Sequence, residues 1–236
     1  RNQQAVEEML DTMKRRGPDQ QNIYTDEAVT LLHARLSVMD LQHGKQPMQL
    51  KSDPRYVMVY NGELYNTEEL RRELQKKGYA FQETSDTEVL LQAFIEWKET
   101  VVERLNGIFA FALYDEEKDE YLIARDPIGV IPLYIGKDAE GHVYFGSELK
   151  ALEGFCDEYE PFLPGHYYHS KEGTMKRWYT RDWMEYKEEN DKQADSRSPT
   201  RQIQDALENA VHRQLMSDVP YGVLLSGGLD SSVISA

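Results

Sequence analysis

The sequence lacks the features that mark secreted, membrane-spanning and disulfide-rich proteins. Its 236 residues include a single cysteine, Cys156, so no internal disulfide framework can form. No apolar run approaches the roughly 20 residues that cross a membrane, and no signal peptide is recognisable. Together these absences indicate a cytoplasmic protein without a membrane partner, in a compartment where thiols stay reduced.

Basic residues are also few. Lys and Arg number 27 against 42 Asp and Glu, which gives a net charge of −15. A surface for nucleic acid is therefore not expected, because phosphate backbones bind faces rich in Lys and Arg. With 40% hydrophobic and 29% charged residues, the composition is that of a globular protein and not of a disordered chain.

The most informative stretch is residues 221–236. Residues 221–225 form a short apolar run that predicts a buried strand, and Leu229 begins a predicted helix. Between them, Ser226, Gly227 and Gly228 allow backbone N–H groups to approach a ligand closely. A turn of this kind at a helix N-terminus attracts anions, which points to a phosphate group and to nucleotide chemistry. The alternative is a plain strand-to-helix turn.

Most of the remaining sequence alternates short strands with a few helices. Apolar spacings of three and four predict a helix over residues 6–13, and helix-start signals recur at residues 66–67 and 84–88. The predicted strands span residues 28–38, 56–60, 107–114, 120–125, 132–136 and 142–146. Residues 107–114 are apolar on both faces, as in a strand packed between two layers. The Asn61-Gly62 step is a strong hairpin signal, so a type I′ turn is the simplest structural interpretation there.

Residues 186–201 are polar and charged and predict a linker. Thr200 then caps a predicted helix with an apolar stripe that includes Ile203 and Leu207. We therefore expect one domain over residues 1–194 and the start of a second over residues 195–236.

Six short motifs follow one another through the first domain. Taken singly they are weak, since Arg35 is as easily a surface ion pair and Asp86 a helix N-cap. The motifs are Arg-Gly-Pro-Asp (16–19), Arg-Leu-Ser-Val (35–38), Asn-Gly-Glu-Leu-Tyr-Asn (61–66), Ser-Asp-Thr-Glu (85–88), Gly-Ile-Phe-Ala-Phe-Ala-Leu-Tyr-Asp (107–115) and Ala-Arg-Asp-Pro-Ile-Gly (124–129). In this order they resemble the glutaminase domain of class II glutamine amidotransferases. Together with residues 217–232, they make the whole chain similar to the family of glutamine-hydrolysing asparagine synthetases.

The resemblance implies an α+β fold. It consists of a four-layer α-β-β-α sandwich of the N-terminal-nucleophile (Ntn) hydrolase type, followed by the beginning of an α/β ATP-pyrophosphatase domain. The first domain would release ammonia from glutamine, and the second would use ATP and Mg²⁺ to convert aspartate to aspartyl-adenylate. Attack by ammonia would give asparagine, AMP and pyrophosphate. The implied partners are small molecules, with a homodimer as an assembly that the family allows.

The resemblance also assigns two sets of site residues. Arg35 would pair with the α-carboxylate of glutamine, and Glu63 and Asp86 would accept hydrogen bonds from its α-ammonium. Asn61 and Gly62 would form the oxyanion hole. The full glutamine set is Arg35, Leu36, Ser37, Val38, Met39, Asn61, Gly62, Glu63 and Asp86. The set for ATP and its pyrophosphate is Leu225, Ser226, Gly227, Gly228, Leu229, Asp230, Ser231 and Ser232. No metal ligand is assigned, and those of Mg²⁺ are expected beyond Ala236.

The nucleophile that the resemblance implies is a cysteine at the mature N-terminus, activated by its own α-amine. Cys156 does not qualify, because it has no free α-amine and neighbours Asp157 and Glu158, which raise the pKa of a thiol. We expect Cys156 to be an inert core residue. We also expect the sequence to be cut at both ends, with the nucleophile and its strand ahead of Arg1. On that reading this polypeptide alone would not hydrolyse glutamine.

Two other interpretations remain open. One is a related ATP-dependent synthetase that amidates a different carboxylate. The other is a catalytically inactive member of the family that binds or regulates. Arg35, Asn61, Glu63 and Asp86 favour a working glutaminase over the inactive member.

Overall fold

The computed structural model describes residues 3–36, 44–181, 184–185, 197–215, 217 and 220–236. The chain divides into two compact units, Arg1–Thr180 and Arg181–Ala236. The domain boundary expected near residue 195 lies outside the described residues and stays a prediction.

The first unit is built around a six-stranded antiparallel sheet. Its strand order is β11-β10-β6-β5-β4-β3. The strands are β3 (Met48–Leu50), β4 (Asp53–Leu64), β5 (Gly107–Asp115), β6 (Glu120–Arg125), β10 (His166–His169) and β11 (Thr174–Arg177). At its centre, β4 pairs with β5 from Tyr56 opposite Asp115 to Leu64 opposite Gly107.

Both faces of this sheet are buried, as the pattern of residues 107–114 predicts. On β5, Phe109 and Phe111 pack into one core cluster, which also contains side chains of the helices that cover this face of the sheet. Ala110 and Ala112 pack into a second cluster on the opposite face. The alternation follows from the two-residue period of a strand. Phe109 and Phe111 therefore face the helices, whereas Ala110, Ala112 and Tyr114 face the opposing strands.

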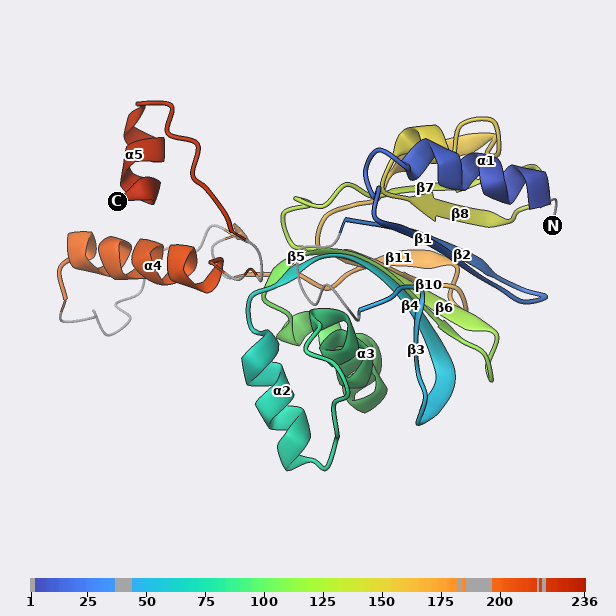
Figure 1. Cartoon of the computed structure of the whole chain (residues 1–236), viewed down its shortest axis with the longest axis horizontal. Helices are drawn as coiled ribbons and strands as arrows, with labels where there is room; N and C mark the ends of the chain where they lie inside the picture. Colours follow the sequence, from blue (N-terminus) through green and yellow to red (C-terminus); the bar gives the residue numbers. More distant parts are fainter. Residues whose placement is uncertain (1–2, 37–43, 182–183, 186–196, 216, 218–219) are drawn as a thin grey trace. The chain divides into compact units, whose positions relative to one another are not determined.

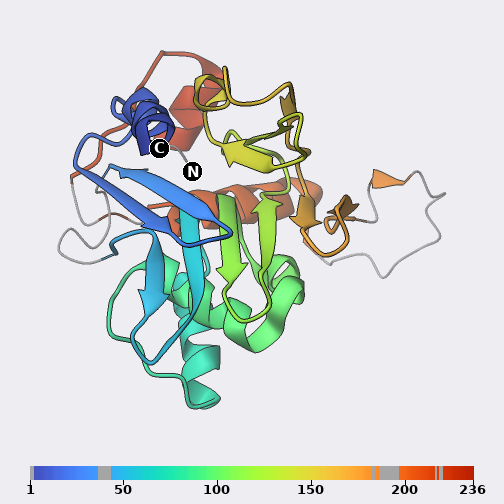
Figure 2. The ribbon, with the colours of Figure 1, turned by 90° about the vertical axis from the view of Figure 1, so that its right-hand side faces the viewer.

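Helices cover one face of the sheet, and a second layer of strands covers the other (Figures 1 and 2). The covering helices are α2 (Thr67–Lys76), α3 (Asp86–Trp97) and the 3-10 helix η1 (Lys98–Arg104). Ser85 caps α3, because its Oγ accepts a hydrogen bond of 3.3 Å from the backbone N of Glu88. The buried side of α3 includes Val89, Leu90 and Ala93, which the sequence places on one helical face.

The second layer consists of two short sheets. One pairs β1 (Gln20–Thr25) with β2 (Thr30–Arg35), and the other has the order β8-β7-β9. The strands of the latter are β7 (Tyr134–Lys137), β8 (Val143–Gly146) and β9 (Glu158–Pro161). Above them lie α1 (Gln3–Met13) and the 3-10 helix η2 (Leu149–Ala151), as Figure 1 shows. The first unit is thus the predicted α-β-β-α sandwich.

The second unit has two helices among its described residues, α4 (Pro199–Arg213) and α5 (Leu229–Ser235). Ser198 and not Thr200 caps α4, since Ser198 Oγ accepts from the backbone N of Arg201 at 3.3 Å. The strand predicted over residues 221–225 is wrong, because these residues have no regular structure and Leu224 is 96% exposed. A strand needs a hydrogen-bonded neighbour, and the described part of this unit contains no other strand. No helix in the described parts of the chain combines the length and the apolar character of a membrane span.

Candidate functional site

A cavity of about 1160 Å³ lies in the first unit, among α1, β2, β4, β5 and β8. The predicted glutamine-site residues that the structure describes all line it, namely Arg35, Leu36, Asn61, Gly62, Glu63 and Asp86. Ser37, Val38 and Met39 lie outside the described residues. Residues from β2, from β4 and from the start of α3 therefore meet at one cavity, although they are far apart in the sequence.

Arg35 is the last residue of β2 and is only 8% exposed. The Arg-Gly-Pro-Asp motif holds its backbone. The N–H of Asp19 donates to the carbonyl of Arg35 at 3.0 Å, and a Cβ on Gly17 would lie 2.1 Å from the backbone carbon of Ala34. Only glycine allows this approach. The guanidinium packs beside Gly44, where a Cβ would come within 3.0 Å of Arg35 Nη2. A buried, fixed guanidinium is well suited to a carboxylate ligand.

Asn61 and Gly62 lie inside β4 and do not form a hairpin turn. They pair with Ala110 and Phe109 of β5, so the type I′ turn suggested by the local sequence is wrong. The strand continues to Leu64 because β5 offers pairing partners as far as Gly107. The backbone at Gly62 has φ +152°, and a Cβ there would lie 2.1 Å from the carbonyl oxygen of Ile108. Asn61 donates through Nδ2 to Ser147 Oγ at 3.3 Å.

Asp86 opens α3 but is not its N-cap, a role that Ser85 takes. Its Oδ2 instead accepts from the hydroxyl of Tyr60 at 2.8 Å and from the backbone N of Leu64 at 3.4 Å. Burial raises the pKa of Asp86. Burial, together with the charge of Asp86, raises the pKa of the Tyr60 hydroxyl well above its usual value. The hydroxyl therefore stays protonated and acts as the hydrogen-bond donor to Asp86. Asp86 is thereby fixed at the cavity wall.

Glu63 is a second carboxyl group at the same wall. Burial and the nearby charge of Asp86 raise the pKa of Glu63 to about 7. Its Oε2 is buried without a hydrogen-bond partner among the described residues. Two partly desolvated carboxyl groups side by side disfavour their charged forms, and a cation between them relieves that cost. The pair fits an ammonium group.

Three neighbours that the sequence did not single out support these residues. Gln46 accepts the backbone N–H of Tyr60 through Oε1 at 2.6 Å, and its own carbonyl accepts from Asn22 Nδ2 at 3.0 Å. Gly44 donates its N–H to Glu83 Oε2 at 2.8 Å. Ser147 is the acceptor for Asn61. Each bond joins residues distant in sequence, so local patterns carry no signal for them.

The Ala-Arg-Asp-Pro-Ile-Gly motif stabilises the strand opposite Gly62. Asp126 is 1% exposed, and its carboxylate accepts hydrogen bonds from Phe109, the partner of Gly62, and from the four residues of its own loop. Those loop donors are the backbone N–H groups of Ile128, Gly129, Val130 and Ile131. Arg125 donates to three carbonyls of the same region, those of Gly129, Ile131 and Phe162. The motif is structural and keeps β5 in place beside the cavity.

In the second unit, the predicted phosphate loop precedes α5. Gly227 has φ +82°, which glycine adopts without strain. Ser226 Oγ and Ser231 Oγ are 2.9 Å apart, and the hydroxyl of Ser232 donates to the carbonyl of Gly228 at 2.8 Å. The loop is exposed throughout, including Leu225 and Leu229 at its two ends. Its hydroxyl groups and glycines gather on one turn, as the sequence predicts.

Residues 1–177 match the family described as glutamine amidotransferase domain. The chain belongs to this glutamine amidotransferase family. Residues 202–236 match a second family, described as asparagine synthase.

Several relatives of this amidotransferase chain are named as glutamine-hydrolysing asparagine synthetases. Asparagine synthetase B of Escherichia coli is 45% identical over 229 residues, which are 97% of this chain and 40% of that protein. Asparagine synthetase 3 of Bacillus subtilis is 39% identical over 265 residues, covering 99% of this chain and 42% of that protein. The chain thus spans about two fifths of the length of these relatives.

Solved structures support the fold. A glutamine phosphoribosylpyrophosphate amidotransferase from B. subtilis, complexed with ADP and GMP, superposes with a TM-score of 0.61 at 23% identity. The match covers 75% of this chain and 47% of that one. At this identity the likeness concerns the fold alone, and it agrees with the Ntn-hydrolase sandwich that the amidotransferase motifs predict.

Cys156 of this amidotransferase domain does not itself line the cavity, although its chain neighbours Phe155 and Asp157 do. Cys156 is partly exposed rather than fully buried, so the expectation of a core residue is only partly met. Its Sγ packs near Gly136 of β7, 2.8 Å from where a Cβ would be. Burial, with the charges of Asp138 and Asp157, raises the pKa of the thiol. A protonated thiol outside the cavity is a poor nucleophile.

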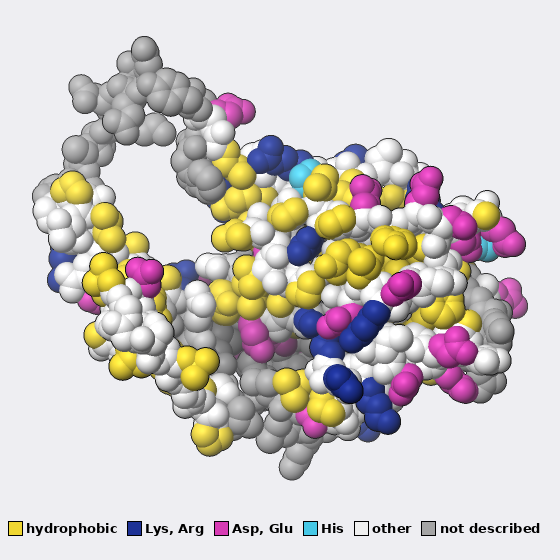
Figure 3. All heavy atoms as spheres, turned by 90° about the horizontal axis from the view of Figure 1, so that it is seen from above, with side chains coloured by type: hydrophobic (Ala, Val, Ile, Leu, Met, Phe, Trp, Pro, Cys, Tyr) yellow, Lys and Arg dark blue, Asp and Glu magenta, His cyan; other side chains and the backbone are white. Residues whose placement is uncertain are grey.

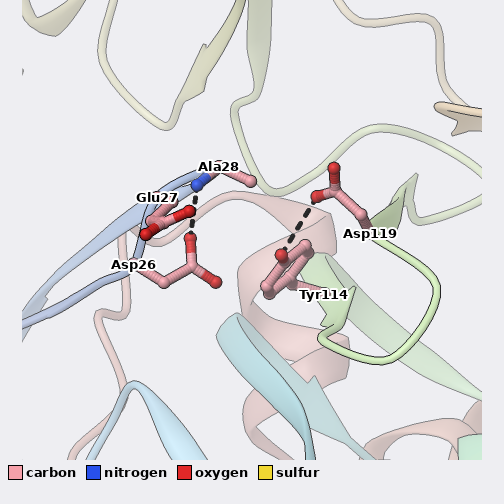
Figure 4. A pocket seen from close by; sticks show the side chains of 5 residues that line it. All are labelled: Asp26, Glu27, Ala28, Tyr114 and Asp119. Carbon is pink, nitrogen blue, oxygen red and sulfur yellow. Dashed lines mark hydrogen bonds between the residues drawn. The ribbon is translucent and has the colours of Figure 1, made fainter.

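Elsewhere on the amidotransferase domain, a smaller pocket of about 590 Å³ is lined by Asp26, Glu27, Ala28, Tyr114 and Asp119 (Figure 4). Tyr114 donates its hydroxyl to Asp119 Oδ1 at 3.0 Å, and Asp26 Oδ1 accepts the N–H of Ala28 at 2.8 Å. These bonds close the surrounding turns. Within the described ranges, no group of three or more His, Cys, Asp or Glu residues is arranged to hold a metal ion. On the face seen in Figure 3, basic and acidic side chains lie beside one another.

Proposed function

We propose that this chain is part of an enzyme that makes asparagine with nitrogen taken from glutamine. The first unit would bind glutamine and release ammonia. The second would begin the domain in which ATP activates aspartate as aspartyl-adenylate, and ammonia would then displace AMP to give asparagine. The observation that carries the proposal is the convergence of Arg35, Asn61, Gly62, Glu63 and Asp86 on one cavity, in a chain 45% identical to asparagine synthetase B of E. coli.

The cavity wall offers complementary groups for both charged ends of an amino acid. We place the α-carboxylate of glutamine against the Arg35 guanidinium, where two parallel hydrogen bonds can form. We place the α-ammonium between Glu63 and Asp86, whose carboxyl groups are destabilised in their charged forms without a cation. Leu36, Ser37, Val38 and Met39 would complete the pocket that follows β2. Binding both charged ends at once selects a free amino acid over a peptide.

Hydrolysis requires a nucleophile and a site for the oxyanion. We assign the oxyanion site to Asn61 Nδ2 and the backbone N–H of Gly62, which would stabilise the tetrahedral intermediate as the amide is attacked. We assign the attack to the N-terminal cysteine that the resemblance implies for the complete enzyme, with its α-amine as base. The protonated thiol of Cys156 takes no part.

The loop before α5 fits a pyrophosphate in its chemistry. Ser226, Ser231 and Ser232 provide hydroxyl groups on one turn, and Gly227 leaves the backbone open to approach. We propose that Leu225 to Ser232 hold ATP through its phosphates, with Leu225 on the adenine side. ATP would supply the adenylate that turns a carboxylate oxygen into a leaving group. We further propose that the enzyme uses ATP together with Mg²⁺ and that it is cytoplasmic. Its partners would be small molecules, and a homodimer would be its assembly.

Replacing Arg35 by lysine in the complete enzyme is expected to weaken asparagine synthesis from glutamine but not asparagine synthesis from ammonia. The charge remains but the second hydrogen bond to the carboxylate is lost, which costs about 1.5 kcal/mol or about tenfold in kcat/KM for glutamine. Synthesis of asparagine from added ammonia should continue at the unaltered rate. Asparagine and pyrophosphate are measured in both assays, with aspartate and ATP saturating.

Equal losses with glutamine and with ammonia would contradict the role of Arg35. Lys171→Ala is the matched control, since this exposed lysine forms an ion pair with Glu120 at 3.6 Å and does not line the cavity. Pyrophosphate release with another acid, and none with aspartate, would contradict the assigned acceptor.

Glutamine binding should weaken as the pH falls from 8 to 6. The pKa of Glu63 is raised to about 7, so its charged form dominates above that pH and is lost below it. The α-ammonium pairs with the charged form, and the ionised fraction falls about tenfold between pH 8 and pH 6. The KM for glutamine should therefore rise by about the same factor.

Glu63→Gln provides the control for this pH dependence. The variant should bind glutamine weakly and with a KM that changes little across the same range. A wild-type KM that is flat from pH 6 to pH 8 would contradict the pairing of Glu63 with the α-ammonium.

A further inference from the structure

Hydrogen bonds link the two layers of strands at the cavity, and one of them joins Asn61 to Ser147. Asn61 Nδ2 on β4 donates to Ser147 Oγ at 3.3 Å, across 86 residues of sequence. Asn61 belongs to the six-stranded sheet, whereas Ser147 directly follows β8 of the opposing sheet. Both residues line the cavity.

The direction of Asn61 follows from the alternation along β4. Val57 and Val59 pack into the core cluster between the two layers, while Tyr56, Met58 and Tyr60 pack against the helices. Asn61 continues the series of Val57 and Val59, so it belongs on the face that looks toward the opposing sheet. Ser147 is the polar group that meets it there.

A primary amide has two N–H donors and one acceptor oxygen, and rotation by half a turn exchanges them. The hydrogen bond from Nδ2 to the hydroxyl of Ser147 occupies one N–H of Asn61 and restrains the amide in the orientation that the structure shows. The second N–H stays available to a ligand. Without the hydroxyl, the amide loses this restraint and can rotate away from the orientation that points an N–H at the ligand.

Ser147 is itself held on both sides. Gly146 ends β8 in register with Tyr134 of β7. Glu148, on the other side, is the residue just before η2, and its carboxylate accepts a hydrogen bond of 3.2 Å from Nη1 of Arg16, which follows α1. The hydroxyl is thus attached to a fixed backbone, and Arg16 of the Arg-Gly-Pro-Asp motif contributes to that anchoring.

We propose that Ser147 is a positioning residue that orients the side-chain amide of Asn61 for oxyanion stabilisation. Nothing in the similarity to known proteins assigns this residue a role. The inference rests on the proposed function of Asn61, and it extends the glutamine site to the opposing layer of the sandwich. Preorganised donors lower a barrier because they need no reorientation during the reaction.

The kinetic test uses Ser147→Ala in the complete enzyme. We expect kcat for glutamine hydrolysis to fall about tenfold, as for the loss of one orienting hydrogen bond, with KM for glutamine unchanged. Ammonia-dependent synthesis should be unaffected, and Ser147→Thr should restore most of the activity. In an Asn61→Ala background, Ser147→Ala should have no further effect. A full additional loss in that background, or equal losses with glutamine and ammonia, would overturn the proposal.

Ser170→Ala is the matched control. Ser170 Oγ also accepts one hydrogen bond, from the backbone N of Tyr121 at 2.8 Å, but Ser170 does not line the cavity. Its removal should leave kcat unchanged. A loss equal to that of Ser147→Ala would show a general structural effect and overturn the positioning role.

A second measurement separates this inference from the proposed function. The side-chain ¹⁵N relaxation of Asn61 can be followed by NMR in the complete enzyme, and Ser147→Ala should lower the order of the amide. Unchanged order overturns the positioning of Asn61 by Ser147, whatever the kinetics show. A second outcome is lower order of the Asn61 amide in Ser147→Ala, with kcat unchanged in both Ser147→Ala and Asn61→Ala. It would support the positioning of Asn61 by Ser147 and overturn the role of Asn61 in the oxyanion hole.

Discussion

Replacing Gly62 by alanine is expected to destabilise the first unit by about 3 kcal/mol or more and to abolish glutamine hydrolysis. The added Cβ would lie 2.1 Å from the carbonyl oxygen of Ile108 and 2.7 Å from the Cα of Phe109. Both are backbone atoms of β5, which is paired on each side, so they cannot move aside without breaking the ladder. Any relief of the clash displaces the N–H of Gly62 and the neighbouring Asn61.

Urea denaturation followed by circular dichroism measures the stability change. Gly78→Ala is the matched control, because Gly78 also has a positive φ, +98°, but a Cβ there meets nothing within 4 Å. It should cost only about 1 kcal/mol, from backbone strain alone. A Gly62→Ala variant no less stable than Gly78→Ala would contradict the close approach of β4 and β5 at this position.

Asn61→Ala is expected to lower kcat for glutamine hydrolysis by about 100- to 1000-fold, with a much smaller change in KM. The donor acts on charge that develops only after attack on the amide, so the bound substrate is little affected. Synthesis from added ammonia should continue, because Asn61 belongs to the glutamine cavity. Steady-state kinetics with each nitrogen source measures both effects.

Asn209→Ala is the control for Asn61→Ala. Asn209 also donates one hydrogen bond through Nδ2, to the backbone carbonyl of Asp205 at 2.7 Å, but on an exposed face of α4. It should leave both activities intact. A rise in KM that accounts for the whole loss in Asn61→Ala would assign the residue to substrate binding and not to the oxyanion hole.

Much of the first unit was predictable because its signals are local. The two-sided apolar pattern of residues 107–114 gave β5, and the Ser-Asp-Thr-Glu motif gave the start of α3. The local reading failed at Asn61-Gly62, where a hairpin signal lies within a long strand. Pairing with β5 outweighs the turn preference there, and no short window of sequence contains that partner.

In the site, too, residues with local sequence signals were predicted, and residues that depend on distant partners were not. Arg35, Asn61, Glu63 and Asp86 were identified by their ordered motifs, and they do line one cavity. Ser147 and Gln46 were not, because their roles depend on hydrogen bonds to distant strands. In the second unit, the helix after Gly228 formed as predicted, whereas the strand before Ser226 did not. A helix satisfies its own backbone, but a strand depends on a neighbour.

The continuous pairing of β4 with β5 also constrains how the length of the chain can change during evolution. Inserting or deleting one residue between Tyr56 and Asn61 would shift the register and turn Asn61 and Glu63 to the opposite face of the sheet. Substitutions in this segment can be tolerated one at a time, but a change in its length would remove several cavity groups together.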